Sequence, residues 1–167
     1  SAKDLWTSKA PKPTPVSAAS AVEYKGEIYL FGGLSGYDAV SGLPVYSDTV
    51  EAYDPAMDTW RSVDSMPAAI SDMAIAVAGD TAYLIGGLDH STGRALTDVI
   101  TYNFETGEWI TTGHGSLTAP RGFAFSSAAP VRNGEIYLTG GWSSGNMEPL
   151  TATEMLPTHD VQINPTI

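Results

Sequence analysis

The chain has 167 residues, 43% of them hydrophobic, and its 19 aspartate and glutamate residues outnumber its 8 lysine and arginine residues, which gives a net charge of −11 at pH 7. This composition predicts a folded domain with a hydrophobic core, and the lack of a basic stripe argues against nucleic acid as a partner. The absence of cysteine excludes disulfide scaffolds, cysteine zinc sites and thiol nucleophiles. No apolar run approaches the roughly 20 residues of a membrane-spanning helix, so no membrane span is predicted.

One strand pattern occurs three times in the chain. The segments are EIYLFGG at 27–33, TAYLIGG at 81–87 and EIYLTGG at 135–141, and their double glycines lie 54 residues apart both times. A run of small or apolar residues and a turn precede each segment, such as AIAVA at 74–78 followed by Gly79 and Asp80. We therefore expect three β-hairpins. The double glycine is typical of a backbone that bends or passes close to another strand.

A third strand and a tryptophan follow the first two hairpins. The third strands are expected at 49–53 and 98–102, and Trp60 and Trp109 come seven residues after Tyr53 and Tyr102. The third unit has a plausible third strand at 151–156, but no tryptophan follows it. Residues 159–163 are either a degraded fourth strand or a tail.

Four short strands in a unit of about 50 residues, with a double glycine, a tyrosine and a tryptophan at set offsets, resemble the kelch repeat of β-propellers. The resemblance implies an all-β fold with three four-stranded blades in a single domain spanning 1–167. The expected units are an N-terminal outer strand at about 4–8 and repeats at about 16–63, 72–112 and 121–163. The tyrosines and tryptophans of the pattern are expected to pack between neighbouring blades rather than to bind a ligand.

The ends of the chain stand in a particular register with the repeat. Trp6 lies 23 residues before Tyr29, as Trp60 lies 23 residues before Tyr83, so Trp6 is expected in the outer strand of an otherwise absent blade. Propellers need about four to eight blades to close. Two explanations therefore stay open: a homodimer that closes a six-bladed ring when each chain adds its Trp6 strand to the third blade of the other, or a piece of a longer propeller.

The order of strands in a blade places the long, variable loops on one face. These loops are expected at 34–48, 88–97 and 142–150, with the connections 62–72 and 111–122 on the same face, whereas the opposite face has only tight turns. Function in a rigid repeat scaffold is concentrated on such loops. The candidate ligand-binding residues there are Tyr37, Asp38, Asp89, His90, Arg94, His114, Arg121, Trp142, Asn146 and Glu148.

Two of these candidates have alternative interpretations. Trp142 directly follows a double glycine, where the other units have Leu34 and Leu88; it either stacks on a sugar or peptide or anchors its loop by partial burial. Arg121 matches a position where kelch repeats often carry arginine near the channel mouth, whereas Val16 and Ile70 occupy the matching places here. Arg121 is therefore either a ligand contact or a structural residue that holds its turn in place as a clamp.

No catalytic residue, metal or cofactor is predicted. The three histidines have no metal-binding spacing and are expected to be solvated loop residues. The least implausible metal or acid–base group on the long-loop side is His90 with His114, with Asp89 beside His90. The fold and the lack of a catalytic constellation predict a binding module for a protein or carbohydrate partner. The alternative is a sugar-converting enzyme, similar to the sialic-acid mutarotases of this family, at the channel mouth of a dimeric six-bladed ring. The acidic surface predicts a neutral or basic partner and salt-sensitive association.

Overall fold

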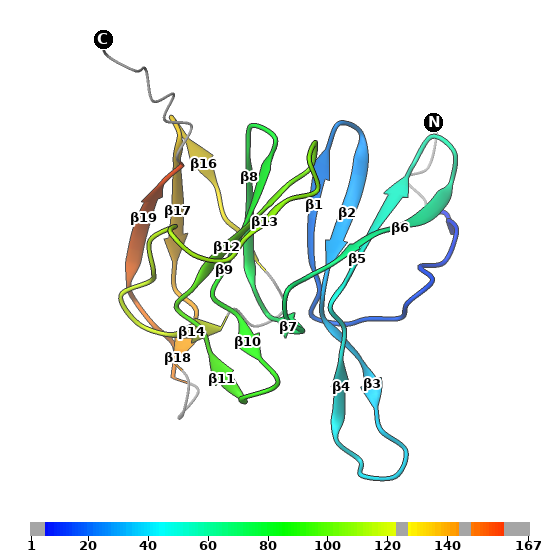
Figure 1. The fold of residues 1–167 in the computed structure, drawn as a ribbon, viewed down its shortest axis with the longest axis horizontal. Helices are drawn as coiled ribbons and strands as arrows, with labels where there is room; N and C mark the ends of the chain where they lie inside the picture. The colour runs from blue at the N-terminus through cyan, green and yellow to red at the C-terminus, as the bar shows by residue number, and fades with distance from the viewer. Residues whose placement is uncertain (1–5, 123–126, 144–147, 159–167) are drawn as a thin grey trace.

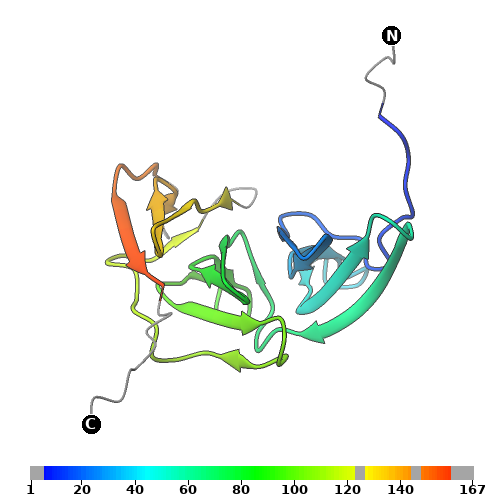
Figure 2. The same cartoon turned by 90° about the horizontal axis from the view of Figure 1, so that it is seen from above.

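The computed structural model describes residues 6–122, 127–143 and 148–158, which form strands and turns and contain no helix. Three main sheets stand side by side as the blades of an arc (Figures 1 and 2). Their innermost strands line the concave side, and the outer strands of blades 1 and 2 lie on the convex side (Figure 2). In the described ranges, therefore, no helix is long and apolar enough to cross a membrane.

Blade 1 is a four-stranded antiparallel sheet in the order β1-β2-β5-β6. Its strands are β1 (Ser20–Tyr24), β2 (Glu27–Phe31), β5 (Thr49–Asp54) and β6 (Thr59–Ser65). Lys25 and Gly26 join the first two strands with φ angles of 49° and 87°, the positive values that a tight hairpin turn of matching twist requires. The predicted hairpin and third strand of the first repeat are confirmed.

Blade 2 repeats this order and takes up a fifth, parallel strand at its inner edge. Its strands are β8 (Ala74–Ala78), β9 (Thr81–Ile85), β12 (Val99–Asn103), β13 (Trp109–Ile110) and β15 (Ser127–Ala128). The strand β15 belongs to the third sequence repeat, yet it pairs with β8 rather than with its own hairpin. The expected first strand of repeat 3 is therefore divided between two blades.

Blade 3 has three strands in the order β16-β17-β19 among the described residues. They are β16 (Val131–Arg132), β17 (Glu135–Thr139) and β19 (Thr153–Pro157). The proposed fourth strand at 159–163 lies outside the described residues. Trp6 is fully exposed and belongs to no strand, and because residues 1–5 also lie outside the described part, the outer strand expected at about 4–8 stays a prediction.

Three small sheets extend from one end of the blades, at the bottom of Figure 1. We call this end, with loops 34–48, 88–97 and 142–150, the long-loop face, and the end with the turns at 25–26, 79–80 and 133–134 the tight-turn face. The small sheets consist of β3 (Leu34–Tyr37) with β4 (Pro44–Tyr46), of β7 (Ile70–Ser71) with β10 (Leu88–Asp89) and β11 (Arg94–Ala95), and of β14 (Arg121–Gly122) with β18 (Trp142–Ser143). The β3–β4 hairpin projects furthest from the blades (Figure 1).

Two hydrophobic cores hold the blades together. The core between blades 1 and 2 is aromatic and aliphatic, with Phe31, Leu84 and Tyr102 among its members, whereas the core between blades 2 and 3 is built largely from alanine, isoleucine and leucine side chains. Trp109 joins the first core from its edge and donates its indole N–H to Asp64 of β6 at 2.9 Å. The predicted packing of the repeat aromatics between blades 1 and 2 is confirmed for Tyr102 and Trp109.

The double glycines mark the point where each blade meets the next connection. Gly32 has a φ of +63°, and a Cβ atom there would lie 2.3 Å from the carbonyl oxygen of Ile70. Gly87 has a φ of +95°, and a Cβ atom there would lie 2.7 Å from the carbonyl oxygen of Ser71. A side chain is excluded at both positions, for steric as well as conformational reasons, as the sequence predicted.

Candidate functional site

The tip of the β3–β4 hairpin is organised by Asp38. One carboxylate oxygen, Oδ1, accepts hydrogen bonds from the Val40 N–H at 3.1 Å, the Ser41 N–H at 2.7 Å and the Ser41 hydroxyl at 2.7 Å. These donors, the backbone of Ser41 first, lower the pKa of Asp38, and Gly42 closes the turn with a φ of 69°. Asp38 is therefore an ionised structural residue of the loop, while the neighbouring Tyr37 is 68% exposed.

The β10–β11 hairpin is built on the same plan by Asp89. Its carboxylate accepts the Ser91 N–H and the Ser91 hydroxyl at 2.8 Å and the Thr92 hydroxyl at 2.9 Å. Burial raises the pKa of Asp89, but the hydrogen bonds from Ser91 and Thr92 outweigh it, so that the pKa is lowered. Gly93 lies four residues after the aspartate, as Gly42 does after Asp38, with a φ of 68°.

His90 joins the two hairpins at their base. Its ring stacks on the Tyr46 ring from blade 1, with the planes 4° apart, and its Nε2 lies 2.8 Å from the Ser71 hydroxyl. Ser71 donates to the Asp72 carboxylate at 2.5 Å, so the Ser71 hydroxyl accepts the His90 Nε2–H. Burial lowers the pKa of His90 to about 4, although Asp72 and Asp89 raise it. His90 is thus neutral at pH 7 and connects the loops of blades 1 and 2.

The structure does not bring His114 to this cluster. His114 packs beside Tyr83 and its Nε2 lies 3.0 Å from the hydroxyl of the buried Thr101. Its neighbours belong to blade 2, whereas His90 stacks on a blade 1 tyrosine. No group of three or more histidine and acidic side chains that could hold a metal ion occurs within 6–122, 127–143 and 148–158. The hypothesis of a shared histidine site is therefore not supported by the geometry.

Arg121 is buried and not on the surface as a ligand contact would require. Its side chain is 1% exposed and pairs with Glu154 of β19, and its Nη1 donates to the Gly140 carbonyl at 3.1 Å. Its own carbonyl accepts the Gly87 N–H at 3.1 Å. Arg121 therefore joins the double glycines of blades 2 and 3, which agrees with the clamp interpretation and removes it from the candidate binding surface.

The remaining candidates lie at the loops of blades 2 and 3. Arg94 and Glu148 are exposed, whereas Trp142 is half-buried and its backbone pairs with Gly122. The Trp142 indole nitrogen is buried and has no hydrogen-bond partner within the described part of the chain. Partial burial agrees with the interpretation of Trp142 as a loop anchor. Asn146 lies outside the described residues.

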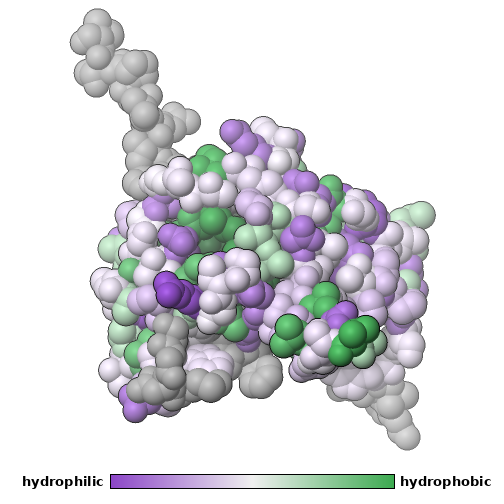
Figure 3. Space-filling model, turned by 60° about the horizontal axis from the view of Figure 1, so that its bottom comes forward, coloured by the Kyte–Doolittle hydropathy of each residue, from purple (hydrophilic) through white to green (hydrophobic). Residues whose placement is uncertain are grey.

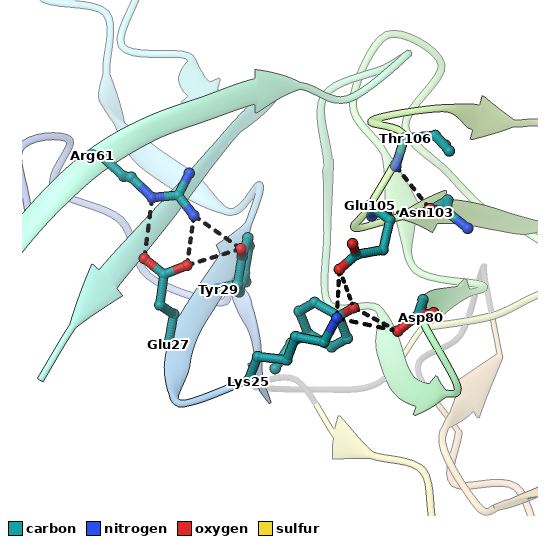
Figure 4. Close-up of polar contacts among 9 residues, drawn as sticks. Lys25, Glu27, Tyr29, Arg61, Asp80, Asn103, Glu105 and Thr106 are labelled. Carbon is teal, nitrogen blue, oxygen red and sulfur yellow. Dashed lines mark hydrogen bonds and ion pairs between the residues drawn. The ribbon is translucent and has the colours of Figure 1, made fainter.

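The opposite, tight-turn face carries polar side chains that are paired with one another (Figure 4). Lys25 Nζ lies 2.7 Å from the Glu105 carboxylate, and the Tyr24 hydroxyl donates to Asp80 at 2.6 Å and interacts with Glu105 at 2.7 Å. Burial, with the Asp80 hydrogen bond, raises the pKa of Tyr24 to about 12. Nearby, Arg61 binds the Glu27 carboxylate with both Nε and Nη2 and reaches the Tyr29 hydroxyl. These contacts fasten blade 1 to blade 2 and stiffen blade 1.

Several residues of the site escaped the sequence analysis. Ser71 and Asp72 sit in a connection before an inner strand, and only their position next to His90 in space gives them a role. Glu154 could have been found by aligning the third strands, because it occupies in β19 the register position that Glu51 has in β5 and Ile100 has in β12.

Comparison with known proteins agrees with this arrangement. The kelch motif model matches residues 15–67 and 69–112, which correspond to the first two repeats and more than half of the chain. The chain belongs to the kelch-repeat family. Its kelch relatives include the Kelch-like protein terF of Aspergillus terreus, which is 33% identical over 148 residues that cover 84% of this chain and 31% of that protein.

Two further relatives are more distant. Beta-scruin of Limulus polyphemus is 26% identical over 94% of this chain and 17% of its own length, and human Kelch domain-containing protein 10 is 24% identical over 83% of this chain and 32% of its own length. The chain thus spans a third or less of these proteins. Kelch repeats are generally protein-interaction modules on propeller scaffolds, and the all-β blades described above are a partial kelch propeller.

Proposed function

We propose that this kelch chain is a protein-binding module that recognises its partner with the long-loop face. The observation that supports it most is the pair of hairpins on this face, β3–β4 and β10–β11. The tip of each is shaped by an aspartate that accepts hydrogen bonds and by a glycine with positive φ four residues later, and the two hairpins meet where the Tyr46 and His90 rings stack. Preorganised loops lose little conformational freedom on binding, which favours affinity. The tight-turn face, in contrast, pairs its charged side chains with one another.

The charge of the chain supports a neutral or basic partner. Loops 34–48 and 88–98 contain Asp38, Asp48, Asp89 and Asp98 against a single cation, Arg94, and the whole chain carries −11. Such a surface steers a basic protein toward it, and the association weakens as salt shortens the screening length.

A display library of folded protein fragments, run beside a glycan array, tests this function. Binders recovered on the immobilised chain are mapped by hydrogen–deuterium exchange, and we expect protection of residues 34–46 and 88–95. Arg94→Glu on the long-loop face should raise the affinity for a basic partner. The matched control is Arg132→Glu, which reverses the charge of an exposed arginine beside the turn at 133–134 on the tight-turn face. Protection confined to the tight-turn face, binding to glycans alone, or turnover of a free sugar would contradict the proposal.

We further propose that two copies close a six-bladed ring, each adding its Trp6 strand to β19 of the other. The segment that follows Trp6 supports this proposal. Residues 10–12 contact blade 1 in the same way as residues 64–66, which follow the outer strand of blade 1, contact blade 2. The Trp60 indole donates to the Ala10 carbonyl at 2.8 Å, just as the Trp109 indole donates to Asp64, and each acceptor comes four residues after a tryptophan. The described part of blade 3 has β19 at its edge, where β6 and β13 complete the other blades.

A further inference from the structure

We infer that the tip of the β3–β4 hairpin is the anchor by which the long-loop face holds its partner, and that it enters an apolar pocket bordered by basic side chains on a protein. This inference rests on the proposed function and specifies the chemistry of the partner. It also holds for a longer propeller, because the hairpin projects beyond the end of the blades rather than from their sides (Figure 1).

The tip carries apolar side chains that the fold leaves in solvent. Val40 is 98% exposed, Leu43 65% and Val45 45%, and Tyr37 beside them is 68% exposed. Figure 3 shows hydrophobic side chains gathered at the end of this projecting hairpin. Exposed apolar groups that lie together on a rigid projection are typical of a protein-interaction site, whereas single scattered ones are common on any surface.

The neighbouring hairpin shows that the loop does not need these side chains. Counting from the capping aspartate, Val40 corresponds to Ser91 and Leu43 to Arg94, and both loops close on a glycine with φ near 69° and 68°. The β10–β11 loop therefore forms with a polar tip on the same frame. Because folding does not require Val40 and Leu43 to be apolar, a binding role explains them.

The tip is also held rigid before any partner arrives. Asp38 Oδ1 takes three hydrogen bonds from Val40 and Ser41, and the Asp38 N–H donates to the Leu43 carbonyl at 2.8 Å. At the base of the hairpin, the Ser35 hydroxyl donates to the Val45 carbonyl at 2.9 Å. An apolar anchor on a fixed backbone is the arrangement of a binding hot spot, in which a few buried side chains provide most of the affinity.

Charge complementarity defines the border of the pocket. The ionised Asp38 sits at the tip itself, Asp48 is exposed at the foot of the hairpin, and no lysine or arginine occurs in residues 34–48. An acidic border would be repelled by these carboxylates, and a basic one would be attracted. A second copy of this chain, itself strongly acidic, is therefore a poor occupant.

The test uses the display library of folded protein fragments, selected on the parent chain. We expect the enriched fragments to carry an apolar pocket bordered by lysine or arginine side chains. The double variant V40S/L43R, which places the residues of the second hairpin on the first, should weaken their binding at least tenfold. Asp38→Ala should weaken binding by a smaller factor through loss of preorganisation. The control is Met57→Ser, which removes a 71% exposed apolar side chain from the β5–β6 turn and should leave the affinity within twofold.

The outcomes separate the anchor from the proposed function. Near-ultraviolet circular dichroism and the melting temperature of V40S/L43R should match the parent, which shows that the hairpin still forms. If the fragments bind the parent and V40S/L43R equally but change affinity with Arg94→Glu, the anchor is overturned while the long-loop face stands. If affinity changes only with Arg132→Glu, both are overturned. Enrichment of fragments with an acidic pocket border, or of none, overturns the anchor.

Discussion

Among single residues, Arg121 contributes to the fold through burial. Its guanidinium connects the double glycine of blade 3 with Glu154, and its backbone connects the double glycine of blade 2 with the end of the β10–β11 loop. A charge in such a place is stabilised only as long as its partner is present, since desolvation is costly for either ion alone.

Arg121→Met should therefore lower the free energy of unfolding by about 3–5 kcal/mol, because Glu154 loses its counter-ion and the Gly140 carbonyl loses a donor. Urea denaturation monitored by tryptophan fluorescence measures the change. Arg94→Met, which alters an exposed arginine on the same face, is the control and should stay within about 0.5 kcal/mol. Equal effects of the two substitutions would contradict the role given to Arg121.

His90 should make stability depend on pH. Its pKa is about 4 in the folded protein and about 6.5 in the unfolded chain, so between these values the unfolded state binds a proton that the folded state does not. Stability is then fully present above about pH 6.5, falls as the pH drops toward 4, and changes no further below it.

The variant His90→Phe keeps a ring on Tyr46 without a titrating group. We expect the free energy of unfolding to fall between pH 7 and pH 4.5 by about 1–2 kcal/mol more in the parent than in this variant. Thermal denaturation of both proteins at each pH gives the comparison, and the shared carboxylates cancel in it. Parallel pH profiles for the two proteins would show that His90 does not titrate in this way.

At the scale of the element, corresponding positions of the repeat use different chemistry. Lys12 and Met66 both lie six residues after a tryptophan, and Glu51 and Ile100 share one register position in their third strands. Met66 and Ile100 are buried between blades 1 and 2, whereas Lys12 forms an ion pair with Glu51, which is itself buried. An apolar pair in one blade is thus an ion pair in the other.

Replacing the ion pair by the apolar pair is informative. Glu51→Ile or Lys12→Met alone should destabilise the protein by about 3 kcal/mol, because each leaves a poorly solvated charge. The double variant K12M/E51I should recover most of that loss or exceed the stability of the parent, since well-packed apolar residues often replace a buried ion pair at no cost. Additive losses in a double-mutant cycle would argue against coupling of the two side chains.

The elements differ in how far sequence predicts them. The hairpins at the centre of each blade follow from local signals: a five-residue apolar strand, a turn with positive φ angles, and the recurring double glycine. The small sheets of the long-loop face have strands of two to four residues, too short for a period of two to stand out. The long-loop face could be predicted, and its loops carry the candidates Tyr37, Asp38, Asp89, His90 and Arg94. The contacts of these residues, the burial of Arg121 and the packing of His114 against blade 2 could not be predicted.

Contacts between distant residues explain the rest. The clamp of Arg121 depends on Glu154, 33 positions further along the chain, and the contacts of His90 are made with Ser71 and Tyr46 from other segments. The division of repeat 3 between blades 2 and 3 is likewise decided by the pairing of β15 with β8, which no local pattern announces.

At the scale of the whole molecule, the outer faces of blades 1 and 3 carry polar groups at register positions that are apolar between blades 1 and 2. Thr139 and Thr153 occupy on blade 3 the register positions of Phe31 and Val50 on blade 1, and their hydroxyls lie 2.9 Å apart. Hydroxyl groups can meet another polar blade surface such as the Lys12–Glu51 pair, which is compatible with the proposed ring.

Absolute mass from light scattering after size exclusion, repeated over a tenfold dilution, tests the ring. A particle of about twice 17.6 kDa is expected, and Trp6→Ala should shift it toward the monomer, because the exchanged strand loses its large side chain. Met57→Ser is again the control and should leave the mass unchanged. A monodisperse monomer at all concentrations would contradict the homodimer and favour a longer propeller.

The common frame of the two hairpins also bears on how such a protein can diversify. Each loop is fixed by an aspartate and a glycine, Asp38 with Gly42 and Asp89 with Gly93. They act through backbone geometry and through hydrogen bonds from backbone N–H groups, which do not depend on the side chains between them. Mutations at the intervening positions therefore leave the blades intact while altering what the surface offers. Folding and recognition can in this way evolve independently, and a tip could be exchanged between hairpins or repeats as a cassette.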